Sequence, residues 1–283
     1  GNPEITFFKS VYKRHTNFSI EAVEASFSAQ PGFGRKVSCP IIRQGDLVGR
    51  TYLKTTIKGT NIIGKFGWVS KVGYAIIKSY ELLIGGSKID KQYGDWLNIW
   101  YELEKGDQKT SIDDMIGNIE TMKNIDNKNK EITLFIPLKF FFCNYIGLAL
   151  PLIALQFHDV RIDIEFRKAH ECINLSGENA ACTPTMTSTS LLINYIYLDS
   201  DERQRFAKAS HEYLIEQLQV TEETISTPSK RIGLIFNHPC KALYWAQTKN
   251  SFTNGNKFLS ENNLEKATKR VVLAYAKLIK YAD

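Results

Sequence analysis

Residues 59–65 are the segment of this chain that comes nearest to a known phosphate-binding motif. Their sequence, GTNIIGK, matches the first seven positions of a P-loop. The eighth position is Phe66, so the hydroxyl that would bind Mg²⁺ is missing. A P-loop also opens a helix whose N-terminus faces the phosphates, whereas Gly67, Trp68 and Val69 are typical of strands and turns. We interpret the segment as a glycine-rich loop between strands and expect no nucleotide or other cofactor.

The histidines and cysteines do not form the spacings that metal binding or nucleophilic catalysis requires. The five histidines include no HExxH pair, and the five cysteines include no CxxC pair. Adjacent groups such as His158 and Asp159 would point to opposite faces of a strand, so they could not bind one metal ion together. No GxSxG nucleophile elbow is present. We therefore expect no metal site and no catalytic residues, and we expect that the protein is not an enzyme.

The composition is that of a folded protein with a mixed surface. Apolar residues make up 43% and charged residues 23% of the 283 residues, which is enough to bury a core. The net charge of +6 comes from 36 basic residues spread among 30 acidic ones, whereas a DNA-binding protein usually clusters basic residues on one face. We expect no sequence-specific binding of nucleic acid. The most apolar stretch, 140–157, contains Asn144, Gly147 and Pro151, which argues against a membrane-spanning helix.

Short strands are the elements that would position any functional surface. Runs of β-branched and aromatic residues are divided by turns, and Gly85-Gly86 is a strong hairpin signal. In the run 18–27, Phe18 and Ile20 lie near alternation with Glu21 and Glu24, as in a half-buried strand. The predicted strands are 5–11, 18–27, 36–43, 49–58, 75–84, 131–138, 152–157, 160–166 and 191–198.

Helices are few in this part of the chain, and this decides the fold class. Helical spacing of apolar residues predicts helices at 95–104 and 111–122. Residues 174–190 are rich in Ser, Thr, Gly and Asn and are predicted to form an exposed loop. A doubly wound parallel sheet needs a crossover helix after nearly every strand, so it is excluded. The sequence therefore predicts an all-β antiparallel sandwich or jelly roll with short helices in its loops.

The character of the sequence changes after Asp199. Asp199, Asp201 and Glu202 are favourable charges for the N-terminus of a short helix. A strand is predicted at 232–236, and we place a domain boundary so that residues 1–221 form a first jelly-roll domain and residues 222–283 begin an incomplete second one. Residues 262–281 are predicted to form a basic amphipathic helix, which would pack on a sheet or lie on a membrane surface.

Two segments fit the N-glycosylation pattern Asn-X-Ser/Thr. Asn17 begins the first segment and lies beside a predicted strand. Asn174 begins the second and falls in the predicted exposed loop, so it is the better candidate for a glycan.

Three blocks of sequence resemble the major capsid proteins of nucleocytoplasmic large DNA viruses, and they occur in the family order. The first resembles the start of those proteins, the second the junction that closes their first barrel, and the third the first strands of their second barrel. The blocks are residues 1–18 (GNPEITFFKSVYKRHTNF), residues 195–217 with YIYLD, DER and HEYLIEQ, and residues 236–245 with FNHPCK and Trp245.

The resemblance implies a double jelly roll in which two barrels stand side by side. It further implies that three copies form a pseudo-hexagonal capsomer, and that capsomers tile an icosahedral shell over an internal membrane. Neighbouring capsomers, minor capsid proteins and penton proteins would be the partners, and the virion, assembled in the host cytoplasm, would be the location. For Tyr12, Arg14 and His15 we expect either contacts at the base of the barrel or an internal hydrogen-bonded corner.

The chain departs from the family pattern at both ends. It does not begin with Met, and we expect it to stop within the second barrel. Two other hypotheses for the function stay open. One is a single-jelly-roll minor capsid or penton protein, or a carbohydrate-binding β-sandwich. The other is an enzyme on a jelly-roll scaffold such as a cupin, which would need clustered His and Glu ligands that this sequence lacks.

Overall fold

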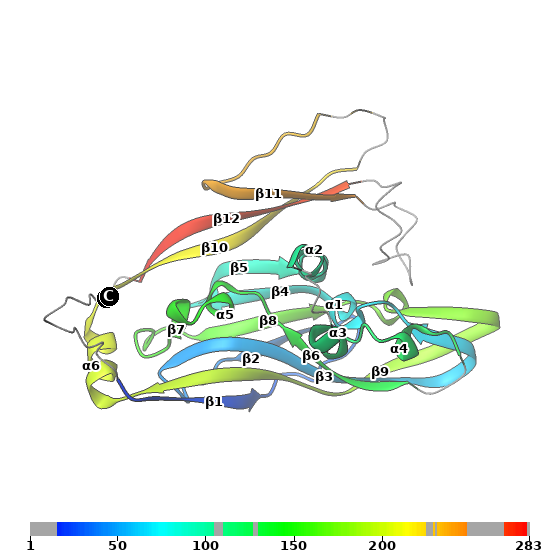
Figure 1. The fold of residues 1–283 in the computed structure, drawn as a ribbon, viewed down its shortest axis with the longest axis horizontal. Helices are drawn as coiled ribbons and strands as arrows, with labels where there is room; N and C mark the ends of the chain where they lie inside the picture. Colours follow the sequence, from blue (N-terminus) through cyan, green and yellow to red (C-terminus); the bar gives the residue numbers. More distant parts are fainter. Residues whose placement is uncertain are drawn as a thin grey trace, which may run out of the picture.

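The first part of the chain folds as two facing antiparallel sheets. The computed structural model describes residues 16–104, 110–126, 130–224, 229, 231–247 and 269–281. One sheet has the order β1-β9-β3-β6, with β7 paired to β3, and the other has the order β2-β8-β4-β5 (Figure 1). The strands of the first sheet are β1 (Phe18–Ala25), β3 (Leu47–Trp68), β6 (Glu131–Pro137), β7 (Leu150–Pro151) and β9 (Ile173–Leu198), and those of the second are β2 (Lys36–Pro40), β4 (Ile77–Ile84), β5 (Ser87–Tyr93) and β8 (Val160–Phe166).

The chain crosses between the two sheets in the order of a jelly roll. β1 and β3 lie in one sheet while β2 and β4 lie in the other, and the last strand, β9, returns between β1 and β3. Every strand pair in both sheets is antiparallel. The predicted all-β jelly roll is therefore confirmed.

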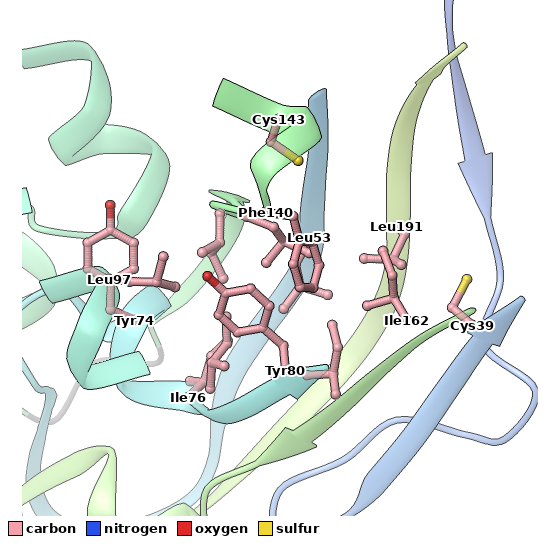
Figure 2. Close-up of a cluster of buried hydrophobic side chains, with 14 of the residues drawn as sticks. Cys39, Leu53, Tyr74, Ile76, Tyr80, Leu97, Phe140, Cys143, Ile162 and Leu191 are labelled. Atoms are coloured by element: carbon pink, nitrogen blue, oxygen red, sulfur yellow. The ribbon is translucent and has the colours of Figure 1, made fainter. Parts of the chain in front are cut away.

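The core fills the space between the two sheets. Figure 2 shows that Leu53 and Leu191 from the first sheet face Tyr80 and Ile162 from the second. All four side chains are fully buried, which is the packing that stabilises a sandwich. The hydroxyl of Tyr80 donates to Gln92 Oε1 over 2.5 Å, so this buried polar group is satisfied.

Local sequence patterns predict several elements correctly. The predicted strand 160–166 is β8, and the Gly85-Gly86 turn joins β4 to β5 with positive φ angles of 56° and 79°. Helix α2 (Gly94–Glu104) matches the predicted helix 95–104. The predicted helix 111–122 is divided into α3 (Thr110–Ile116) and α4 (Glu120–Lys123), because Gly117 takes a φ of 74° that ends a right-handed helix. The predicted strand 5–11 lies outside the described residues.

Three predictions of local structure are wrong in this first part. Residues 152–157 form turns instead of a strand. The predicted loop 174–190 lies within β9, because β3 supplies hydrogen-bonding partners along almost its whole length. Residues 59–65 belong to β3 and not to a loop, and Gly64, with a φ of 76°, lies at an irregularity opposite Ala180 and Ala181. The strand continues beyond this segment to Trp68, so no helix opens at the position where a P-loop would require one.

Short helices occupy the connections between strands. α1 (Val72–Ile76) lies between β3 and β4, and α2, α3 and α4 lie between β5 and β6. α5 (Phe141–Asn144) and η1 (Ile146–Leu148) follow β6, and η2 (Ala169–Glu171) precedes β9. α6 (Ser200–Lys208) leads out of the barrel (Figure 1).

A third sheet lies beside the barrel, next to β5 and α2 (Figure 1). It consists of β10 (His211–Glu222), β12 (Lys269–Tyr281) and β11 (Cys240–Gln247), in the order β10-β12-β11. The predicted helix 262–281 is therefore wrong over residues 269–281, which pair with β10 from His211 to Glu222. Residues 262–268 lie outside the described part. The predicted strand 232–236 is also wrong, since these residues form no regular element.

Candidate assembly surface

The edge strand β1 presents apolar side chains to solvent. Phe18 is 63% exposed and Ile20 is 49% exposed. Val23 and Ala25 pack against the core instead, so alternation along the strand places Phe18 and Ile20 on the outer face. This is the opposite of the half-buried arrangement that we predicted for the two residues. Among the described residues, β1 pairs only with β9, so its second edge carries no strand.

The apolar surface of β1 continues onto its neighbour and onto α6. Ile20 is aligned with Ile196 of β9, and Phe18 is aligned with Leu198. Ile196 packs with Leu47, Ala149, Leu198 and Phe206 in a small cluster outside the main core. Aligned residues of antiparallel strands share a face, so these side chains form one strip. We call Phe18, Ile20, Leu198 and Phe206 the β1 strip.

Loops at one end of the barrel also expose apolar residues. Phe157, just before β8, is 95% exposed, and Ile42, Tyr145 and Ile146 are exposed too. The loop that contains Ile42 is hydrogen-bonded to the loop that contains Phe157, because the Arg43 guanidinium donates to the Leu155 carbonyl over 2.5 Å. Fixed loop tips that expose apolar side chains are typical of contact surfaces.

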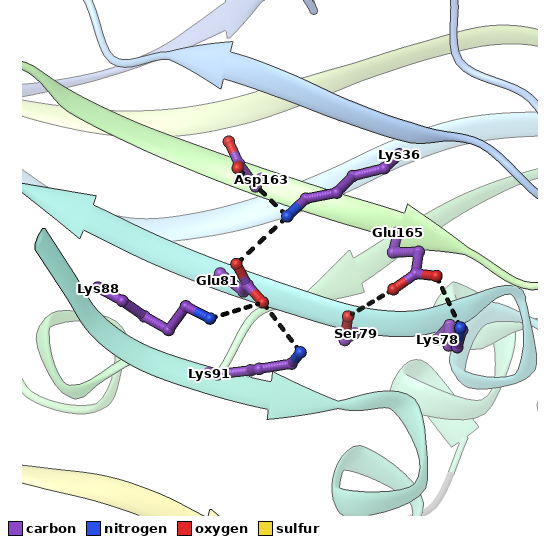
Figure 3. A network of polar contacts seen from close by, with 8 residues as sticks. All are labelled: Lys36, Lys78, Ser79, Glu81, Lys88, Lys91, Asp163 and Glu165. Atoms are coloured by element: carbon purple, nitrogen blue, oxygen red, sulfur yellow. Dashed lines mark hydrogen bonds and ion pairs between the residues drawn. The ribbon is translucent and has the colours of Figure 1, made fainter. Parts of the chain in front are cut away.

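The outer face of the second sheet has a different, charged character (Figure 3). Glu81 is nearly buried and pairs with Lys91 over 3.0 Å, Lys88 over 3.3 Å and Lys36 over 3.4 Å. Burial by itself would raise the pKa of Glu81, but the hydrogen bond and charge of Lys91, together with the other lysines, lower it. Lys36, Lys78, Lys88 and Lys91 thus lie among the carboxylates of Glu81, Asp163 and Glu165, so this face is polar and charged where the β1 strip is apolar.

One ion pair holds α6 against the end of the barrel, and a side-chain cap begins the helix. The Arg203 guanidinium contacts both oxygens of Asp46, with Nε 2.9 Å from Oδ1 and Nη2 3.1 Å from Oδ2. The carboxylate of Asp199 accepts from the Glu202 N–H over 2.9 Å and caps the helix. The prediction that Asp199, Asp201 and Glu202 lie at the N-terminus of a short helix is confirmed. α6 thereby sets where β10 begins.

Aromatic side chains join the barrel to the third sheet. Trp96 and Trp100 of α2 contact Tyr244 of β11, with ring centroids 5.3 Å and 6.3 Å apart. Leu218 of β10 packs with Trp96 in the same cluster. Apolar burial therefore holds the third sheet against the side of the barrel.

Comparison with known sequences decides the family. A family model described as major capsid protein N-terminus matches residues 6–199. A second model, described as large eukaryotic DNA virus major capsid protein, matches residues 202–278. The chain belongs to this family of viral capsid proteins. The predicted resemblance is confirmed, and the family is one of structural proteins.

Relatives in the family include proteins from several viruses. The chain is 43% identical to capsid protein 1 of Acanthamoeba polyphaga mimivirus, over 97% of this chain and 51% of that protein. It is 47% identical to the major capsid protein of Pyramimonas orientalis virus, over 87% of this chain and 61% of that protein. A PBCV-1 virus capsid model contains a chain that matches with a TM-score of 0.72 and 35% identity, over 88% of this chain and 60% of that one. The chain thus spans about half to six tenths of these relatives.

The structure places only some of the residues that the sequence singled out. Tyr12, Arg14 and His15 lie outside the described residues. Asn174 is the second residue of β9 and is aligned with Gly67 of β3, so it does not lie in a loop. Across the described ranges, no group of three His, Cys, Asp or Glu side chains could bind a metal ion. None of the helices that the structure describes has both the length and the apolar character needed to span a bilayer.

The sequence reasoning missed the residues that form the β1 strip. Phe18 and Ile20 were visible as apolar residues of a strand, but periodicity alone does not tell which face is buried. The useful signal was that Val23 and Ala25 lie in the opposite phase of the same strand. An edge strand that carries apolar residues on both of its faces indicates a second contact surface besides the core.

Proposed function

We propose that the chain is a structural capsid protein whose work is contact between copies, without catalysis. Three copies form a pseudo-hexagonal capsomer, and capsomers tile the icosahedral shell of a large DNA virus. The protein functions in the virion after assembly in the host cytoplasm. Family membership and a jelly roll with an exposed apolar strip support this proposal.

The β1 strip is the observation that carries the proposal. A closed sandwich has no need of apolar residues on its outer face, because burial of such residues is favourable only against a partner. Obligate interfaces between copies are apolar and typically bury more than about 2,000 Å². We assign the β1 strip to the contact between neighbouring copies in the capsomer.

The exposed residues of the third sheet support the proposal that this sheet is part of a second barrel. Trp245 is 68% exposed and Leu243 is also exposed, whereas Tyr244 between them packs on the first barrel. A sheet with apolar residues on both faces needs a second layer. We propose that further strands of a second jelly roll cover Leu243 and Trp245. The division into residues 1–221 and 222–283 stays a prediction.

We propose that the exposed loop tips at the barrel end face inward. Phe157, Ile42 and Tyr145 would contact minor capsid proteins, penton proteins or the internal membrane there. Tyr12, Arg14 and His15 are proposed contacts at this base. Asn174 remains a proposed glycan site, which glycopeptide mass spectrometry tests. We propose no sequence-specific contact with nucleic acid.

The oligomeric state of the purified protein tests the assignment of the β1 strip. Light scattering after size exclusion should give the mass of three copies for the unaltered protein. Phe18→Ser combined with Ile20→Thr should shift the mass toward one copy, because the apolar area at the contact is lost. Circular dichroism checks that the barrel stays folded.

A matched control uses another exposed apolar residue. Ile63→Thr, on the distant part of β3, should leave three copies together. A single copy in the unaltered protein at high concentration would overturn the proposal and favour a single-jelly-roll minor capsid protein or binding module. Equal loss of assembly in the Ile63 variant would overturn the assignment to β1.

A further inference from the structure

β10 runs along the outer edge of β5, and one carboxylate spans the space between them. Asp90 of β5 is only 3% exposed. The main-chain N–H of Leu218, in β10, donates to Asp90 Oδ1 over 3.1 Å. Next to it, the side-chain amide of Gln217 donates to the Ile89 carbonyl. We call these four residues the β5–β10 joint; it connects the first barrel to the third sheet.

The joint continues as a hydrogen-bond network into the core of the barrel. Asp90 Oδ2 accepts from Gln92 Nε2 over 2.6 Å. The same Gln92 amide donates to the Lys139 carbonyl over 2.8 Å and accepts from the Tyr80 hydroxyl over 2.5 Å. Both oxygens of Asp90 therefore receive neutral donors, one from each side of the joint.

No cation balances Asp90 among the residues that the structure describes. Lys88 and Lys91, its charged neighbours in β5, pair with Glu81. Lys139 contributes its carbonyl to the network and pairs its ammonium group with Glu104 over 2.9 Å. On β10, Gln217 and Leu218 are uncharged, and the one other titratable group in the network is Tyr80.

We propose that the β5–β10 joint is tightened by acid, with Asp90 binding a proton when the joint closes. A protonated carboxyl keeps acceptor capacity for the Leu218 N–H, so closure survives protonation. The closed joint then no longer holds an unpaired charge away from water. The third sheet is thus fixed more firmly to the barrel in acid than at neutral pH.

The sign follows from the two environments of the carboxyl group. In the closed joint, burial raises the pKa of Asp90 to about 6, although hydrogen bonds from the Gln92 side chain and from the main-chain N–H groups of Leu218 and Lys91 act to lower it. An opened joint returns the group to water and to its ordinary, lower pKa. Closure therefore takes up a proton, gains stability as the pH falls through about 6, and loses that gain as the pH rises again.

Hydrogen exchange of the full chain tests the proposal. The protection of the Leu218 amide, corrected for the direct effect of pH on exchange, should rise about tenfold between about pH 7.5 and about pH 5. Amides of Ile162 and Ile164 serve as internal references, because β8 lies between β2 and β4 in its sheet and does not pair with β10. Constant or falling protection at Leu218 relative to these references would overturn the proposal without any variant.

Two variants assign the effect to Asp90. Asp90→Asn removes the titration, so protection at Leu218 should no longer change with pH. Asp114→Asn, an exposed carboxylate in α3, should leave the tenfold change intact. A pH dependence that persists in folded Asp90→Asn protein would contradict the assignment.

Discussion

Lys71 has a buried ammonium group and a left-handed backbone at the start of α1. Its side chain is 1% exposed, and its φ is 52°. The ammonium group forms an ion pair with Glu102, donates to Asn98 Oδ1 over 3.0 Å, and lies 4.8 Å from the centre of the Tyr101 ring. These contacts connect α1 to α2. At the residue scale, the sequence shows a lysine but not the partners that make its burial possible.

Removing this ammonium group should destabilise the barrel. We expect Lys71→Met to lower the free energy of unfolding by about 1–3 kcal/mol, measured by urea denaturation. The cost stays below that of a fully buried pair, because Glu102 is 35% exposed and water can solvate its carboxylate. Lys208→Met, at the exposed end of α6, should change the same quantity by less than about 0.5 kcal/mol. Equal effects of the two changes would refute the structural role of Lys71.

α6 shows how a local signal positions a whole element. Asp199 caps the helix, and Asp46 binds Arg203 from the side of the barrel. The cap was predictable, because it depends on residues within one turn. The contact between Asp46 and Arg203 was not predictable, because it joins residues that are distant in sequence.

The helix cap has a measurable contribution. We expect Asp199→Ala to reduce the stability of α6 by about 0.5–2 kcal/mol, seen as faster amide exchange within residues 200–208. Asp201→Ala removes only a favourable charge at the N-terminal end of the helix dipole and should lower the stability of α6 by about 0.3–1 kcal/mol. A larger effect at position 201 than at position 199 would argue against the observed cap.

Elements whose patterns are local were predictable, and elements defined by a distant partner were not. β8 alternates regularly over its seven residues and was predicted with its observed bounds. Residues 174–190 look like a loop by composition, but β3 makes them part of β9. Residues 269–281 look like an amphipathic helix, but β10 pairs with them along its length. Tertiary pairing overrides local propensity in both segments.

At the scale of the whole molecule, the family resemblance implied a double jelly roll, and no pattern in the sequence predicted the order of its strands. β1 pairs with β9, and nearly all the other strands of the first barrel lie between these two in the sequence. No local pattern encodes such a pairing, although short strands with few helices do exclude parallel folds. Apolar residues on both faces of β1 signalled a second contact surface, but periodicity did not tell which face packs on the core and which meets another copy.

Electron cryo-microscopy of the purified oligomer tests this account most directly. We predict a ring of three copies in which Phe18 and Ile20 lie at the contact between neighbours, while the charged face around Glu81 stays outside that contact. A ring joined through the Glu81 face with the β1 strip open to solvent would contradict the account, and so would particles that contain one copy only.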